Sequence, residues 1–198
     1  MNKWQFLVSF SLFDLLPRII VRLRAVFFGL FLGKFFHKLG RCVKVRGVRH
    51  ILVGRGICIG DFCWIEAVTH FSGVELAPKL EFDDGVSLSD STHISCAHSI
   101  KIGKSCLIGS KVYIGDHSHG TLLNTLEMFS IPPAKRPLGD IAAIDIGSNS
   151  WICDGAVILA GTRLAPHTIV GANSVVRMQT DRPALIAGAP AKVIRYFD

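Results

Sequence analysis

The chain has 198 residues, 49% of them apolar, and a formal net charge of +7, which excludes a disordered protein and allows one domain with a sizeable core. The charge is uneven, because residues 1–60 carry a net +10 and residues 61–198 carry a net −3. A basic segment rich in Phe and Leu favours an anionic membrane surface as partner, and the absence of any nucleic-acid recognition motif in the sequence argues against nucleic acid.

Residues 3–40 predict two helices, because Pro17 suits the first turn of the second helix and Gly40 suits a position near its end. The first 16 residues resemble a secretory signal only superficially, since Asp14 and Pro17 interrupt the apolar run and no cleavage site of small residues follows. The six cysteines form no Cys-x-x-Cys pair and are expected as free thiols. We therefore expect a cytoplasmic protein.

The second part of the chain carries an internal repeat of six residues. Neither an α-helix, with a period of 3.6, nor an isolated strand, with a period of 2, produces such a period. It is typical of a solenoid in which each hexapeptide forms a short strand and a corner, and three hexapeptides complete one coil. Residues 42–198 thus predict an all-β solenoid, a parallel β-helix that follows a helical segment at 1–41. The clearest run of in-phase aliphatic residues is Ile146, Ile152, Ile158, Leu164, Val170 and Val176.

Residues 120–145 interrupt this repeat with a long insertion. Pro132, Pro133 and Pro137 prevent a regular helix or strand there. Long loops inside a compact domain usually carry function, so we expect a functional loop.

The most polar motif of the chain lies just before this insertion. His117 falls outside the aliphatic positions, so its side chain is expected on the outside of the coil, where it can act as a general base. His119 is expected to point the same way. Asp116 is not expected to orient His117, because adjacent strand residues face opposite sides. Glu127 or Asp140 in the loop are the candidates for that role.

Five features together resemble the hexapeptide-repeat O-acetyltransferases, nearest to the branch that acts on polysaccharides and lipopolysaccharides and is related to the maltose and galactoside enzymes. These features are the repeat, the Asp-His-x-His-Gly motif with its loop, the pair Trp151-Ile152, the segment Gly171–Val176 and the tail Ala187–Ile194. The resemblance covers about residues 45–198. It implies a left-handed coil, a homotrimer with active sites between neighbouring coils, acetyl-CoA as co-substrate, no metal, and a sugar acceptor in O-antigen or capsule biosynthesis.

The resemblance also implies roles for individual residues. It places catalysis on His117 and the recognition of the acceptor near Ser89, Asp90 and His119. Family members often carry Asn where Ser89 stands, which leaves the acceptor open. The residues expected to bind coenzyme A, along the pantetheine arm and at the phosphates, are Trp151, Asp154, Gly171, Ala172, Arg177 and Lys192.

The expected mechanism is direct transfer. His117 removes the proton of the sugar hydroxyl, the alkoxide attacks the thioester carbonyl, and a backbone N–H stabilises the oxyanion. No Ser or Cys nucleophile beside a base is evident in the sequence, so we expect no acyl-enzyme.

Two other classes share the repeat. A γ-type carbonic anhydrase binds zinc through three histidines, and His93 and His98 have the spacing of two of them, but no third histidine is evidently placed. A non-catalytic scaffold would keep the repeat and lose the histidine motif, which this chain retains.

The segment 1–41 has two interpretations. Its best apolar stretch, residues 19–36, contains three basic residues, which favours an interfacial helix over one that crosses the membrane. The segment either caps the open end of the coil or docks on the inner leaflet, where lipid-linked saccharides are candidate acceptors.

Overall fold

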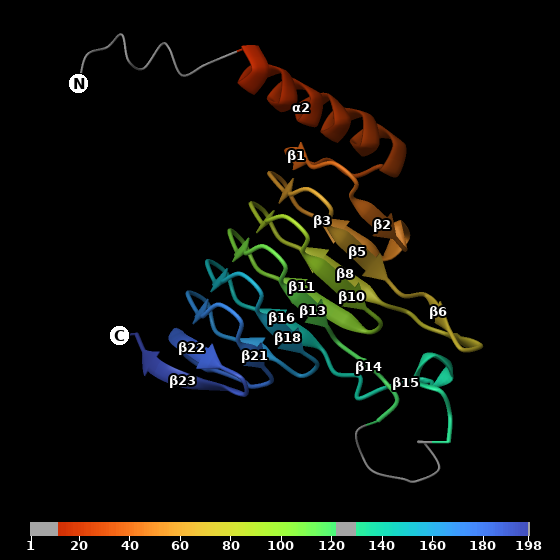
Figure 1. The fold of residues 1–198 in the computed structure, drawn as a ribbon, viewed down its shortest axis with the longest axis vertical. Helices are drawn as coiled ribbons and strands as arrows, with labels where there is room; N and C mark the ends of the chain where they lie inside the picture. Colours follow the sequence, from red (N-terminus) through yellow and green to blue (C-terminus); the bar gives the residue numbers. More distant parts are fainter. Residues whose placement is uncertain (1–11, 122–129, 198) are drawn as a thin grey trace.

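The computed structural model describes residues 12–121 and 130–197 and consists of one helix followed by a three-sided coil of short strands (Figure 1). Each turn of the coil visits three parallel sheets, here named C, A and B, in that order. The fold is a left-handed parallel β-helix, as the repeat and the family resemblance predict.

The strands are two to six residues long, as a hexapeptide with a corner requires. Sheet A holds β1 (Lys38–Leu39), β4 (Cys58–Ile59), β9 (Ser87–Leu88), β12 (Leu107–Ile108), β17 (Trp151–Ile152), β20 (Ile169–Val170), β22 (Ala184–Gly188) and β23 (Ala191–Tyr196). Sheet B holds β2 (Lys44–Arg46), β5 (Trp64–Ala67), β10 (His93–Cys96), β13 (Tyr113–Gly115), β18 (Val157–Leu159) and β21 (Val175–Val176). Sheet C holds β3 (Ile51–Val53), β8 (Lys79–Phe82), β11 (Ser99–Ile102), β16 (Ile144–Ile146) and β19 (Arg163–Leu164).

The core is a set of aliphatic columns inside the coil. In-register pairing of neighbouring strands places each inward residue on the one below it, as Ile152 stacks between Ile108 and Val170. All six aliphatic residues predicted between Ile146 and Val176 are at most 2% exposed. Each such side chain contributes about 1.5–3 kcal/mol by burial, so the repeat itself supplies most of the driving force for folding.

Carboxylates hold the corner between sheets A and B, which we call the A–B corner (residues 40–43, 60–63, 89–92, 109–112, 153–156 and 171–174). Asp61 accepts a hydrogen bond from the backbone N–H of Arg41 at 2.7 Å. Asp90 accepts one from the N–H of Asp61 at 2.8 Å, and Asp154 accepts one from the N–H of Ser110 at 2.7 Å. Three pairs of neighbouring coils are thereby tied together, which satisfies backbone donors that the corner takes out of the ladder.

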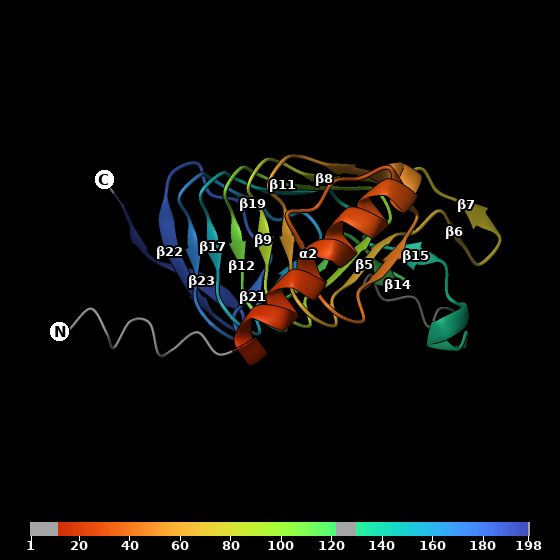
Figure 2. The same ribbon diagram turned by 90° about the horizontal axis from the view of Figure 1, so that it is seen from above.

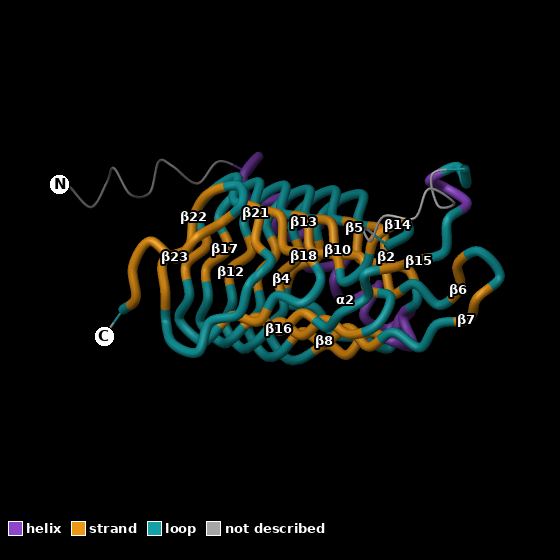
Figure 3. The backbone as a smooth tube through the Cα atoms, turned by 90° about the horizontal axis from the view of Figure 1, so that it is seen from below, coloured by secondary structure: helices purple, strands orange, loops and turns teal. Residues whose placement is uncertain are grey.

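Two excursions leave the coil at the corner between sheets B and C, which we call the B–C corner. Residues 68–78 form the hairpin of β6 (His70–Phe71) and β7 (Val74–Glu75). Residues 116–143 contain β14 (Ser118–His119), paired antiparallel with β15 (Leu138–Gly139), and a 3-10 turn at Pro133–Lys135. Figure 3 shows both projecting from the same side of the coil. The insertion expected at 120–145 therefore begins earlier, directly after β13.

The N-terminal prediction of two helices needs correction in its boundaries. Helix α2 (Leu12–Leu32) contains Pro17 instead of starting there. It ends before Gly33, whose φ of 62° closes the helix, and not near Gly40, because Lys38–Leu39 already pairs with β4. The part of the predicted segment before residue 12 lies outside the described residues.

Helix α2 lies across the N-terminal end of the coil (Figures 1 and 2), and Ala25 on its inner face is buried in the common core. No helix within residues 12–121 and 130–197 combines the length and the apolarity needed to span a bilayer.

Candidate active site

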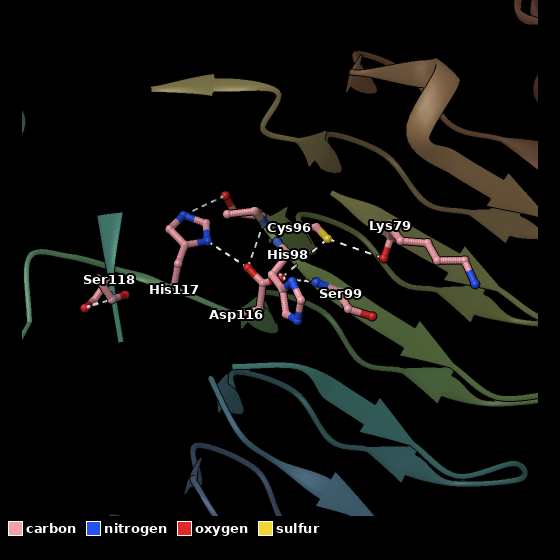
Figure 4. A network of polar contacts seen from close by, with 10 residues as sticks. Lys79, Cys96, His98, Ser99, Asp116, His117 and Ser118 are labelled. Atoms are coloured by element: carbon pink, nitrogen blue, oxygen red, sulfur yellow. Dashed lines mark hydrogen bonds and ion pairs between the residues drawn. The ribbon is translucent and has the colours of Figure 1, made fainter. Parts of the chain in front are cut away.

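His117 lies at the B–C corner, where the chain has left β13 and begins the long excursion (Figure 4). Its side chain is only 8% exposed, and its Nδ1 lies 2.9 Å from Oδ1 of Asp116. This contact fixes the ring and leaves Nε2 directed away from the carboxylate.

The expectation that Asp116 does not orient His117 is wrong. It assumed the alternation of a strand, but β13 ends at Gly115, and beyond it the side chains of Asp116 and His117 turn toward each other. Of the two residues proposed instead, Glu127 lies outside the described residues, and Asp140 accepts a hydrogen bond from the hydroxyl of Ser118 at 3.3 Å.

Asp116 is fully buried and held by the tight corner of the coil below. Its carboxylate accepts backbone N–H bonds from Ala97 at 2.7 Å and from His98 and Ser99 at 2.8 Å each. Burial pushes the pKa of Asp116 upward, but the hydrogen bonds from His117, Ala97 and His98 outweigh it and keep the pKa below its ordinary value. Asp116 is therefore an anion that keeps the imidazole proton on Nδ1 and leaves Nε2 as the base.

Replacing Asp116 by Asn is expected to destabilise the fold by about 3 kcal/mol, since an uncharged amide cannot serve three N–H donors and Nδ1 together. The pKa of Asp116 is lower in the folded state than its ordinary value of 3.8. The ionised carboxylate therefore stabilises the fold fully above pH 3.8, and this stabilisation is lost as the pH falls through the pKa of the folded state. The gap in unfolding free energy between the wild type and Asp116→Asn should be constant above about pH 5 and shrink in acid. Urea titrations over this pH range check it; a gap that does not change with pH would contradict the ionic role.

Ser95 lies on the other side of the imidazole. Its hydroxyl is 3.5 Å from Nε2 of His117, and its strand position in β10 pairs with Gly115 in β13. The sequence-based prediction that no Ser or Cys lies beside a base therefore needs correction. The side chains of Ser95, His117 and Asp116 form one continuous series of polar contacts. Sequence reasoning missed it because 22 residues separate Ser95 from His117.

An aromatic row follows the outer face of sheet B next to this site. The rings of Trp64 and His93 stack at 4.5 Å, and the ring of Tyr113 meets His93 edge-on at 5.3 Å. Burial lowers the pKa of His93, Glu66 opposes this, and the nearby His117 adds to the lowering, so His93 is held as the neutral ring. We did not predict this row from the sequence. It could have been predicted, because each of the three aromatic residues directly precedes an inward isoleucine in sheet B and so occupies the same outward position of the repeat.

The residues predicted to recognise the acceptor are not all near His117. The ring of His119 lies 5.1 Å from that of Phe71 in the β6–β7 hairpin, which places it at the B–C corner beside the base. Ser89 and Asp90 instead lie at the A–B corner, on the opposite side of sheet B.

Five of the six residues predicted to bind coenzyme A lie away from His117, either in sheet A or at the A–B corner. Asp154, Gly171 and Ala172 follow β17 and β20 at the A–B corner, and Trp151 is exposed on the outer face of sheet A. Lys192 lies in β23. The exception is Arg177, which directly follows β21 on the side of sheet B where His117 lies. Within one chain, the structure therefore separates the expected base from most of the expected coenzyme A site.

The described residues contain no group of three or more His, Cys, Asp or Glu side chains placed to hold a metal ion. His93 is stacked in the aromatic row, and His98 is an exposed corner residue. The zinc site of the carbonic anhydrase alternative therefore lacks a third ligand in the described part of the chain.

Comparisons with known proteins point to one family, although no family model matches the chain. The chain is 40% identical over 119 residues to the putative lipopolysaccharide biosynthesis O-acetyl transferase WbbJ of Escherichia coli K12, across 59% of this chain and 60% of that protein. It is 26% identical over 143 residues to the galactoside O-acetyltransferase of the same strain, across 69% of this chain and 62% of that protein. It thus spans about three fifths of the length of these relatives.

The fold comparison agrees. The chain matches a mutant of AntD, an N-acyltransferase from Bacillus cereus in complex with dTDP-4-amino-4,6-dideoxyglucose and coenzyme A, with a TM-score of 0.62 and 17% identity, over 79% of this chain and 78% of that one. At this identity the match establishes the fold alone. In sequence the chain is similar to O-acetyltransferases, as its repeat and its histidine motif predict, and in fold it is similar to an acyltransferase.

Proposed function

We propose that this protein is an O-acetyltransferase that moves an acetyl group from acetyl-CoA to a sugar hydroxyl. The observation that carries the proposal is the Asp116–His117 pair, a buried anion that fixes an imidazole with Nε2 available as a base. The similarity to WbbJ, whose name refers to lipopolysaccharide biosynthesis, favours an acceptor in cell-surface polysaccharide synthesis, such as O-antigen or capsule.

In the proposed reaction, Nε2 of His117 takes the proton of the acceptor hydroxyl while the oxygen of that hydroxyl attacks the thioester carbonyl. The C–O bond forms, the C–S bond of the thioester breaks, and the imidazolium returns its proton to the leaving thiolate of coenzyme A. Asp116 stabilises the imidazolium between these two steps. We propose direct transfer without an acyl-enzyme, which is supported by the 3.5 Å between the Ser95 oxygen and Nε2, longer than the ~2.6–3.2 Å typical of an activated nucleophile.

A homotrimer would resolve the separation of the base from the coenzyme A residues. Asp154, Gly171 and Ala172 lie at the A–B corner, whereas His117 lies at the B–C corner. Packing the A–B corner of one copy against sheet B of the next would bring the two together. We propose that the pantetheine arm follows this corner beside Trp151, that Arg177 and Lys192 meet the phosphates, and that Ser89 and Asp90 contribute to acceptor recognition across the same interface, with His119 beside the base.

The test is a coenzyme A release assay with acetyl-CoA and a panel of free sugars, nucleotide sugars and lipid-linked oligosaccharides. Release that depends on a sugar is expected, and light scattering of the same preparation should give three times the chain mass of 21.6 kDa. Release with none of the acceptors, from a folded trimer loaded with acetyl-CoA, would overturn the proposed activity.

We further propose that residues 1–41 hold the protein at the inner face of the cytoplasmic membrane, while residues 42–198 form the transferase unit. Helix α2 supports this because its outer side is apolar, and exposed basic residues surround it at the same end of the coil. The apolar residues are Ile19, Leu23, Val26, Phe27 and Leu30. The exposed basic residues are Arg22, Lys38, Arg41, Lys44, Arg46, Arg49 and Arg55.

A further inference from the structure

Tyr113 occupies a position next to the base that its strand geometry alone does not explain. It precedes the inward Ile114, so its side chain leaves the outer face of sheet B. Its ring then bends along the strand over Gly115: a Cβ added to Gly115 would lie 2.6 Å from Cζ and 2.8 Å from Cε1 of Tyr113. Any side chain at position 115 would displace the ring, so glycine is what lets the phenol lie there.

This position puts the phenol over the patch that Nε2 of His117 faces. Gly115 pairs in register with Ser95, and paired parallel strands lie about 4.8 Å apart. The Ser95 hydroxyl is in turn 3.5 Å from Nε2. The phenol over Gly115, the Ser95 hydroxyl of the neighbouring strand and the imidazole therefore follow one another from contact to contact.

The chemical state of Tyr113 suits a hydrogen-bond donor. Burial raises the pKa of its phenol, and the anionic Asp116 raises it further, so the hydroxyl keeps its proton. The Tyr113 hydroxyl makes no hydrogen bond to any residue of the described ranges 12–121 and 130–197. The nearby backbone N–H of Asp116 is not available as a donor, because it already donates a hydrogen bond to the Ser95 carbonyl. The phenol is thus a positioned donor that has no acceptor among the described residues.

We propose that Tyr113 is a second catalytic residue, whose hydroxyl donates a hydrogen bond to the thioester oxygen as negative charge develops on it. This inference rests on the proposed acyl transfer at His117. The oxyanion donor is then the side chain of Tyr113 and not the backbone N–H expected from the sequence. Gly115 has the role of leaving room for that side chain.

The test is Tyr113→Phe, which keeps the ring contact with His93 and removes only the hydroxyl. The kcat for coenzyme A release is expected to fall about 10²- to 10³-fold, the usual loss for one oxyanion donor, with little change in the KM of either substrate. Slow hydrolysis of acetyl-CoA without acceptor should fall in parallel, because it passes through the same oxyanion. The matched control is Tyr196→Phe, the same change at the only other tyrosine, which lies in β23 against Arg182.

A kcat within twofold of the wild type would overturn the proposal, as would a raised acceptor KM at unchanged kcat, which would make Tyr113 a binding residue. Gly115→Ala is a second variant, expected to reproduce the kcat loss while thermal unfolding shows a folded protein. Failure of the proposed function itself would be visible earlier, as absence of sugar-dependent release by the wild type.

Discussion

His117→Ala is expected to lower the kcat for coenzyme A release by about 10²- to 10⁴-fold, the range that a general base contributes. The acceptor hydroxyl then has no positioned group to take its proton, while the sites for acetyl-CoA and sugar stay intact, so KM values should change little. Steady-state release assays with saturating substrates measure this directly. A kcat near that of the wild type would remove His117 from the mechanism.

The loss must be separated from damage to the fold, because Asp116, whose side chain is 0% exposed in the native structure, loses its imidazole partner in this variant. Three backbone N–H bonds still hold its carboxylate, so the variant should fold, and its unfolding temperature reports whether it does. The control is His167→Asn, at an exposed position with φ of 61° that Asn tolerates, which should leave kcat unchanged.

Removing the apolar outer side of α2 is expected to release the protein from anionic vesicles. The five residues Ile19, Leu23, Val26, Phe27 and Leu30 recur with the spacing of one helix face and are 45–72% exposed. A helix that turns such a face outward and carries cations at its flanks is typical of an interfacial anchor. The triple variant Leu23→Ser, Phe27→Ser, Leu30→Ser should weaken binding about 10²- to 10³-fold, if each side chain contributes about 1 kcal/mol or more.

Cosedimentation with vesicles of phosphatidylglycerol and phosphatidylcholine measures this binding, and salt should weaken it in the wild type. The matched control is Leu52→Ser, Leu107→Ser, Ile194→Ser, which removes the same number of exposed apolar side chains from the coil. Unchanged vesicle binding by the α2 variant would refute the anchor. A fall in particle mass in the α2 variant alone would instead show that the helix joins copies of the chain.

The fold could be predicted because a period of six is stored locally in each hexapeptide, as the complete burial of Ile146 and Ile158 shows. The site could be predicted only in part. His117 stood out by its own motif, but its partners come from other coils or from beyond the end of a strand. Asp116 was rejected as the partner of His117 because side chains alternate along a strand, but the strand ends at Gly115. Ser95 lies near Nε2 only because β10 pairs with β13.

The helix boundaries show the same limit. Pro17 is an ordinary start signal, but α2 begins before it, and Gly33 ends the helix before Gly40 because the next residues are needed to pair with β4. Local signals rank candidate boundaries, whereas tertiary pairing chooses among them.

The last strand of the coil has a consequence for how copies of this protein can meet. β23 runs antiparallel to β22, so the edge it offers reverses the direction that every earlier strand of sheet A shares. A second molecule cannot continue the winding from that edge in register, and Lys192 and Arg195 on it would repel an identical edge. At the other end, α2 lies across the opening. End-to-end stacking of two described coils is thereby disfavoured at either end, which favours contact between copies along the sheets.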